Sequence, residues 1–178
     1  MDGKIQFELV SPERLILSEP VGMVVVPGSE GNFGVLPGHA LFISTVRPGI
    51  IDVYADGMPA ITERIFIAGG FAEVTPERCT VLADEAAPLG SLDRAQIEGD
   101  ARTLESTVAG LKDQVQRASD SDRPELQVEL ASAQRRLAVA HAKLAALGAG
   151  GADIGLAGAQ STAVVRRTAP VQRDLPDR

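Results

Sequence analysis

The stretch "VPGSEGNFGVLPGHA", residues 26–40, places glycines and prolines at short intervals among apolar and short polar residues. Proline presets φ and glycine accepts positive φ, so this composition favours turns between short strands over a helix. A loop of this kind has two interpretations. It could cradle a phosphate, or it could display backbone and short side chains to a partner.

Alternating apolar residues on both sides of this stretch predict β-strands. In residues 4–10, Ile5, Phe7 and Leu9 alternate with polar residues, which is the period of a half-buried strand. Further segments rich in Val, Ile and Phe, bounded by Pro, Gly or Asp, follow at residues 22–28, 41–47, 49–55, 64–70, 71–74 and 78–84. We therefore expect residues 1–90 to form an antiparallel β-sandwich or flattened barrel.

After Gly90 the apolar period changes to steps of three and four, which is typical of one helix face. A polar break separates two such stripes, so we expect an antiparallel two-helix hairpin over residues 91–147. Pro124 is expected in the first turn of the second helix, and Gly148 at its end. The stripes are Ile97, Ala101, Leu104, Val108, Leu111 and Val115, then Leu126, Leu130, Ala133, Leu137, Ala140, Leu144 and Leu147.

One of the six positions in the first stripe and two of the seven in the second are alanine, which buries less apolar surface than leucine. The hairpin therefore needs contact with the β-domain or with a partner for stability. Two alternatives for the hairpin remain equally open: it packs permanently on the sandwich, or it changes its docking position. Residues 148–178 combine glycines, small residues and prolines without a sustained period, and we expect a disordered tail there.

Charge excludes one large class of function. The net charge is −7, and residues 1–90 alone carry 12 acidic and 5 basic residues. Binding to nucleic acid needs a basic patch that neutralises phosphates, so no nucleic-acid partner is expected. No apolar stretch is long enough to span a bilayer, and we expect membrane contact only through partner proteins.

Signals for chemistry are weak. Gly28 and Gly34 do not have the spacing of a phosphate-binding loop, and no lysine follows. The lone Cys79, expected as a small buried hydrophobe, matches no zinc spacing with the two distant histidines. The adjacent acids Asp84 and Glu85 are better explained as a solvated strand end than as a catalytic dyad. We expect no catalytic residue, metal or cofactor.

Four segments together resemble the epsilon subunit of bacterial F-type ATP synthases, whose mitochondrial counterpart is the delta subunit. They are "FELVSPERLI" (7–16), "VVVPGSEGNFGVLPGHALFISTVRPGII" (24–51), "IAGGFAEV" (67–74) and "TVLADEA" (80–86). The resemblance covers residues 4–147. It implies a ten-stranded β-sandwich followed by two helices, in agreement with the patterns above.

The resemblance also implies a function. Such subunits are non-catalytic rotor components of the central stalk, peripheral on the cytoplasmic side of the inner membrane. They bind the gamma subunit and the c-ring and couple proton flow to ATP synthesis. The family's ring contact corresponds here to Ser29, Glu30, Gly31 and Asn32, with His39 nearby. The opening loop is thus expected to face a protein.

In many bacterial members the hairpin extends along gamma towards the alpha and beta subunits and inhibits ATP hydrolysis. Some members bind ATP through a motif [I/L]-D-x-x-R-A. Leu92 and Asp93 match this motif, but Gln96 and Ile97 stand where Arg-Ala belongs. The remaining nucleotide candidates, Arg135 and Arg136, lie on the second helix. Nucleotide sensing through the hairpin is therefore the alternative function.

Overall fold

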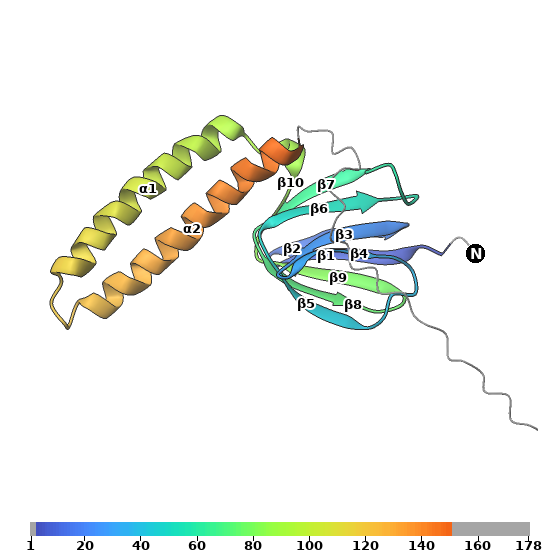
Figure 1. Cartoon of the computed structure of the whole chain (residues 1–178), viewed down its shortest axis with the longest axis horizontal. Helices are drawn as coiled ribbons and strands as arrows, with labels where there is room; N and C mark the ends of the chain where they lie inside the picture. Colours follow the sequence, from blue (N-terminus) through green and yellow to red (C-terminus); the bar gives the residue numbers. More distant parts are fainter. Residues whose placement is uncertain (1–2, 151–178) are drawn as a thin grey trace, which may run out of the picture.

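The computed structural model describes residues 3–150, and the expected tail after residue 150 lies outside them. A β-domain comes first and a helical hairpin follows it (Figure 1). The strands are β1 (Ile5–Ser11), β2 (Arg14–Val21), β3 (Met23–Gly28), β4 (Gly31–Val35), β5 (Phe42–Val46), β6 (Gly49–Tyr54), β7 (Glu63–Ile67), β8 (Gly70–Val74), β9 (Arg78–Ala83) and β10 (Ala86–Pro88). A 3-10 turn η1 (Leu89–Ser91) leads into α1 (Arg94–Arg117) and α2 (Arg123–Gly150).

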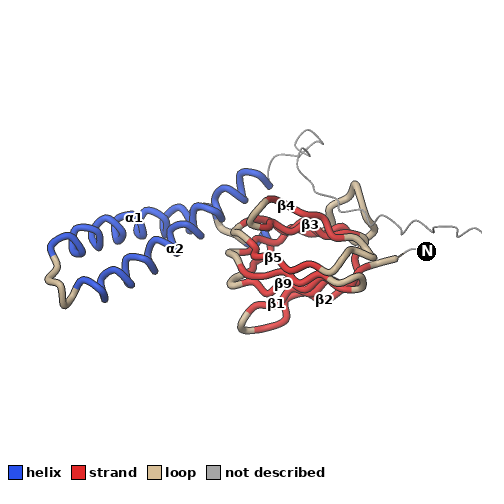
Figure 2. The backbone as a smooth tube through the Cα atoms, turned by 60° about the horizontal axis from the view of Figure 1, so that its bottom comes forward, coloured by secondary structure: helices blue, strands red, loops and turns tan. Residues whose placement is uncertain are grey.

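The ten strands form a sandwich of two layers, which confirms the predicted fold class. One layer has the order β4-β3-β6-β7-β10, and the other has the order β5-β8-β9-β1-β2. The layers are continuous at one corner, where β3 and β5 pair only through Gly28 and Val46. Neighbouring strands are antiparallel except β1 and β9, which run parallel. Figure 2 shows the strands stacked at the base of the hairpin.

The core lies between the two layers and is almost wholly aliphatic. Ile5, Phe7 and Leu9 are fully buried, as their alternation predicts. Cys79 is buried among them, and burial raises the pKa of its thiol to about 12 because the charged thiolate would lose its hydration. Each fully buried large side chain contributes about 1.5–3 kcal/mol of transfer free energy, so this core holds the sandwich together.

Three strands lie outside the segments predicted from the sequence: β4, which falls within the turn-rich stretch 26–40, and the strands β2 and β10. β2 places Leu15, Ile16 and Leu17 in succession, which hides the alternation, and it contains Pro20. It forms the edge of its layer, where a residue without an N–H is tolerated. β10 is only three residues long and pairs with β7. Both β2 and β10 owe their strand conformation to a neighbouring strand.

The two helices pack against each other along the predicted stripes. Ile97, Ala101, Val108 and Leu111 of α1 are buried, together with small residues of α2. Asp93 caps α1 by accepting a hydrogen bond from the backbone N–H of Gln96 at 3.1 Å. Among the described residues, neither helix combines the length and apolar character needed to cross a membrane.

The end of α2 differs from the expectation. Pro124 lies in the first turn as predicted, but the helix continues past Gly148 to Gly150. Glycine terminates a helix when it adopts positive φ, and Gly148 does not do so. It only weakens the helix there, by about 1 kcal/mol relative to alanine.

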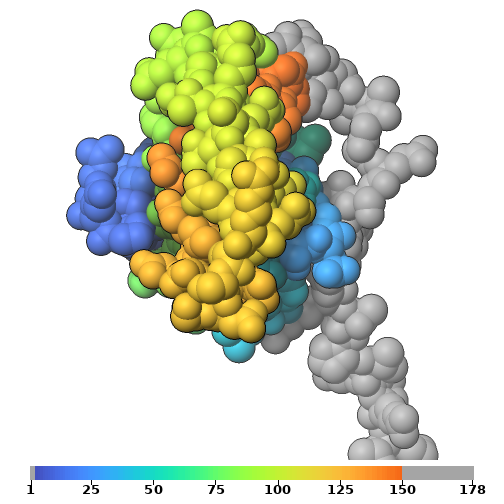
Figure 3. Space-filling model, turned by 90° about the vertical axis from the view of Figure 1, so that its left-hand side faces the viewer, coloured from blue at the N-terminus to red at the C-terminus, as the bar shows by residue number. Residues whose placement is uncertain are grey.

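The hairpin meets the sandwich only near its base. The last turns of α2 cover Phe66 of β7, and Ala146 is buried there with Leu89. Most of the hairpin projects away from the strands (Figure 2). Figure 3, seen from the hairpin side, shows α1 in yellow-green lying over α2 in orange, with the blue N-terminal part of the sandwich beside them.

Candidate partner-binding site

The predicted contact loop is a tight turn between β3 and β4. Ser29 and Glu30 occupy its tip, and both are exposed. Gly31 follows with φ of 135°, a conformation that favours glycine over any residue with a Cβ. No atom lies within 4 Å of where a Cβ on Gly31 would be, so the turn is open to close approach by a partner.

Strand β5 and its following residues brace this turn. The backbone N–H of Ser29 donates to the carbonyl of Thr45 at 3.1 Å, and the Thr45 hydroxyl donates to the Ser29 hydroxyl at 3.1 Å. Arg47 Nη2 donates to Asn32 Oδ1 at 2.7 Å. These bonds hold the loop in one shape. Glu30 forms no ion pair with the described residues, so it presents its charge outwards.

His39 does not lie near the turn. It follows β4 at the end opposite to Ser29, because β4 runs back along β3 and pairs Val35 with Val24. A five-residue strand spans about 16 Å. Its Nδ1 donates to the carbonyl of Ala40 at 2.8 Å, and its ring lies 6.4 Å from that of Phe42. The structure therefore brings together Ser29, Glu30, Gly31 and Asn32, and separates His39 from them.

A larger exposed feature lies on the outer side of the layer β5-β8-β9-β1-β2. The register places Phe71 opposite Leu82, Leu82 opposite Val10, and Val10 opposite Leu15. Cross-strand partners share a face, so these four form one continuous apolar row. Ile43 of β5 lies on the same face, diagonally next to Phe71, whose direct partner on β5 is Thr45. Phe71, Leu82, Leu15 and Ile43 are each more than half exposed, and we call the five residues together the outer apolar face.

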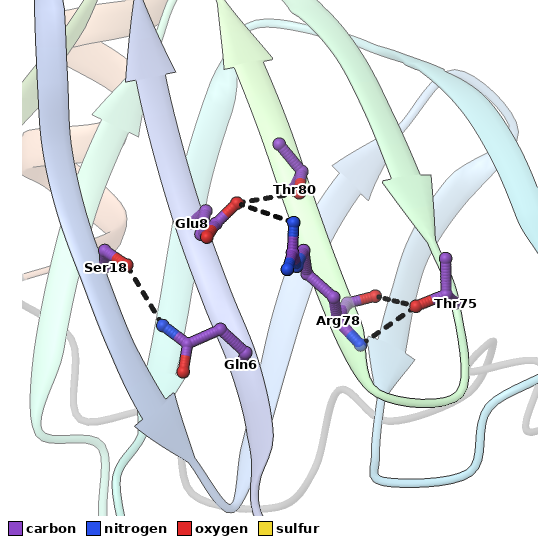
Figure 4. A network of polar contacts seen from close by, with 6 residues as sticks. All are labelled: Gln6, Glu8, Ser18, Thr75, Arg78 and Thr80. Atoms are coloured by element: carbon purple, nitrogen blue, oxygen red, sulfur yellow. Dashed lines mark hydrogen bonds and ion pairs between the residues drawn. The ribbon is translucent and has the colours of Figure 1, made fainter.

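The same sheet surface becomes polar further along the strands (Figure 4). Glu8 Oε2 accepts a hydrogen bond from the Thr80 hydroxyl at 3.3 Å and lies 3.7 Å from Arg78 Nη1. Gln6 Nε2 donates to the Ser18 hydroxyl at 3.0 Å. An apolar patch bordered by satisfied polar groups is the usual composition of a protein–protein interface.

The outer apolar face was not predicted from the sequence, although a signal for it was present. In β1, β8 and β9 the inward positions are apolar as expected, yet Val10, Phe71 and Leu82 occupy outward positions. Each exception is unremarkable alone, because single exposed hydrophobic residues are normal. Only the register of three strands from distant parts of the chain aligns them into one row.

The four candidate nucleotide residues do not all line one cleft. Arg135 and Arg136 line a cleft of about 860 Å³ between the hairpin and the end of the sandwich, which Leu92 and Asp93 do not line. The side chain of Leu92 packs against the clusters that contain Ala146 and Ala140, and Asp93 is used as the helix cap.

The acidic pair has a structural role. Asp84 and Glu85 form the connection between β9 and β10, and Glu85 makes an ion pair with Lys143 of α2. Within residues 3–150, no three His, Cys, Asp or Glu side chains gather in a way that could hold a metal ion.

Two further side chains with shifted pKa values, Asp52 and Tyr54, lie on β6. Burial raises the pKa of Asp52 more than Arg64, with Nε 3.2 Å from Asp52 Oδ1, lowers it. Burial, together with the Asp52 charge, also raises the pKa of Tyr54. These shifts follow from packing on the sheet and mark no convergent catalytic cluster.

The chain thus combines a β-sandwich that carries a braced exposed turn and an outer apolar face with a helical hairpin that projects from it. The ATP synthase epsilon chain of Rhodospirillum centenum is 53% identical over 138 residues, which cover 77% of this chain and 92% of that relative. This chain therefore belongs to the ATP synthase epsilon-chain family.

Other comparisons agree with this family. The sequence model for the ATP synthase delta/epsilon chain β-sandwich domain matches residues 4–89. The epsilon chain of Rhodospirillum rubrum is 59% identical over 107 residues, covering 57% of this chain and 78% of that one. A chain of the Euglena gracilis mitochondrial ATP synthase, solved as OSCP/F1/c-ring, superposes with a TM-score of 0.52 at 24% identity, covering 83% of this chain and 81% of that chain, and shows the same fold.

Proposed function

We propose that this chain is a non-catalytic rotor subunit in the central stalk of a proton-translocating F-type ATP synthase. It links the gamma subunit to the c-ring and couples proton flow to ATP synthesis. In this role it is peripheral on the cytoplasmic side of the inner membrane, held there by its partners. The observation that carries the proposal is the outer apolar face on a chain whose relatives are ATP synthase epsilon chains.

The outer apolar face is the proposed contact with gamma. A row of large apolar side chains on a rigid sheet is costly to leave in water, and a partner that covers it gains transfer free energy. Glu8, Arg78 and Thr80 border the row as a polar rim. Such a rim limits the orientations in which a partner can bind.

The β3–β4 turn is the proposed contact with the c-ring, through Ser29, Glu30, Gly31 and Asn32. The bonds from Thr45 and Arg47 keep the turn in one conformation before a partner arrives, so little entropy is lost on binding. Glu30 supplies a negative charge for basic groups on the ring. His39 is left out of this contact because it lies at the other end of β4.

Rigidity supports a rotor role. Torque passes between two partners only if the body between them does not bend. Here the two contact regions lie on one sandwich whose layers are joined through a fully buried core. Protein interiors of this kind are close-packed and only slightly compressible, so a force at the turn reaches the apolar face.

Removing the chain is expected to uncouple the enzyme. In inverted membrane vesicles that lack this chain, we expect proton flow to continue with little ATP synthesis, because no body connects gamma to the ring. Complementation with the complete chain is the control and should restore synthesis. Normal ATP synthesis in vesicles without the chain would refute the proposal.

Inhibition of ATP hydrolysis by the hairpin, through the alpha and beta subunits, is a separate hypothesis. Its test is a complex in which the chain stops after Asp93. If the hairpin restrains hydrolysis, this complex hydrolyses ATP faster than the complex with the whole chain. Equal rates would remove the inhibitory role without affecting the coupling role.

Nucleotide sensing is the alternative function, and Arg135 and Arg136 in the cleft are the observation in its favour. Leu92 and Asp93 do not line this cleft, and Asp93 is used as the helix cap, which weighs against nucleotide sensing. We therefore expect isothermal titration calorimetry of the isolated chain with millimolar ATP to show no saturable heat. A saturable signal that disappears in the Arg135→Ala, Arg136→Ala variant would establish a nucleotide site.

A further inference from the structure

The two helices of the hairpin are held to each other by their own clusters, and the hairpin is attached to the sandwich at its base. Two clusters hold α1 and α2 to each other, one around Ile97 and Ala140 and one around Val108 and Leu111. Attachment to the sandwich depends on one further cluster, in which Ala146 is the buried residue of α2 and Val139, Ala142 and Leu147 are partly buried against it. A partly buried side chain gains less transfer free energy than a fully buried one, so each of these three contributes less to docking than a core residue would.

One charged side chain strengthens this attachment. Lys143 of α2 projects between the ring of Phe66 and the carboxylate of Glu85, with Nζ 5.8 Å from the ring centroid and in direct contact with Glu85 Oε1. Its side chain is only 19% exposed, whereas that of Glu85 is 49% exposed. An ammonium group held over an aromatic face and paired with a carboxylate is attracted by both.

The chain connecting hairpin and sandwich can act as a hinge. Leu89 is buried on the sandwich side, and Asp93 already caps α1. Between them, Gly90 has no atom within 4 Å of where its Cβ would be, and Ser91 bonds only locally, to the carbonyl of Pro88 at 2.8 Å. Rotation at Gly90 and Ser91 would break one backbone bond of η1, from the N–H of Leu92 to the carbonyl of Leu89 at 3.3 Å, and would leave the strands and both helices intact.

We propose that Lys143, clamped between Phe66 and Glu85, fixes the docked position of the hairpin. Loss of this clamp releases the hairpin as a unit that turns about Gly90 and Ser91. Lys143 is thus a positioning residue for the hairpin. This inference rests on contacts within the chain and does not depend on the proposed function.

Pulsed electron paramagnetic resonance on the complete isolated chain tests the clamp. Spin labels at Ser121→Cys, on the helical tip, and Met58→Cys, in the exposed β6–β7 loop, report the distance between hairpin and sandwich. The native Cys79 is buried and escapes labelling. We expect one narrow distance distribution in the parent and a broad one in Lys143→Glu and in Glu85→Lys.

Each single charge reversal replaces the attraction between residues 85 and 143 with repulsion. The ratio of docked to released hairpin should therefore fall about tenfold, which corresponds to about 1.4 kcal/mol. The double variant Glu85→Lys, Lys143→Glu should recover most of the narrow distribution. Lys112→Glu, at an exposed position of α1, is the matched control and should resemble the parent. Lys143→Met, which keeps the apolar stem, should broaden the distribution less than Lys143→Glu.

Two results would overturn the proposal. One is a narrow distribution in Lys143→Glu that matches the parent. The other is a double variant as broad as the single variants, which would assign the effect to packing alone. Circular dichroism confirms in each case that the sandwich and the helices are still folded.

Discussion

Replacing Gly70 by alanine is expected to lower the free energy of unfolding by about 3 kcal/mol or more. Gly70 begins β8 with φ of 133°, and a Cβ there would lie 2.0 Å from the carbonyl oxygen of Leu82. That oxygen belongs to the neighbouring strand and cannot turn aside as a side chain would. The strands β8 and β9 must separate, at the expense of the pairing of Gly70 with Ala83.

Gly90→Ala is the matched control. Gly90 has no positive φ and no atom within 4 Å of its Cβ position, so the change should be nearly neutral. Thermal unfolding followed by circular dichroism measures both variants. For a domain of this size we expect the melting temperature of Gly70→Ala to fall by about 6–12 °C. Equal melting temperatures for the two variants would contradict the strand geometry described above.

The double variant Phe71→Glu, Leu82→Glu is expected to weaken binding to the gamma subunit about a hundredfold or more. The two side chains are cross-strand neighbours at the centre of the outer apolar face. Covering each contributes about 1.5–3 kcal/mol, and a carboxylate buried without a counter-charge adds a further cost. The variant should fold normally, because both positions face outwards.

Biolayer interferometry with purified gamma measures this loss. Met58→Glu, Val128→Glu is the matched control, since it also replaces two exposed apolar residues but away from the outer apolar face. The control should bind gamma as the parent chain does. Unchanged affinity in Phe71→Glu, Leu82→Glu, with the fold intact, would remove the outer apolar face as the gamma contact while leaving family membership untouched.

Of the candidate site, the β3–β4 turn could be predicted from the sequence and the outer apolar face could not. Ser29, Glu30, Gly31 and Asn32 are contiguous, so recognising the loop was enough to bring them together. Val10, Phe71 and Leu82 come from three strands that lie side by side only because β1 inserts parallel to β9. His39 is the opposite case. It lies only seven residues after Asn32 in the sequence, but β4 runs between them and carries His39 to the other end of the strand.

The sequence by itself determined the type and order of the elements, because apolar periods of two and of three to four are local properties. It also determined the loop composition and the family. Tertiary structure alone decided which outward residues share a face, where β2 and β10 pair, and how Lys143 meets Glu85 and Phe66. These features depend on strand register and on the docking of α2, which are set by contacts between segments far apart in the chain.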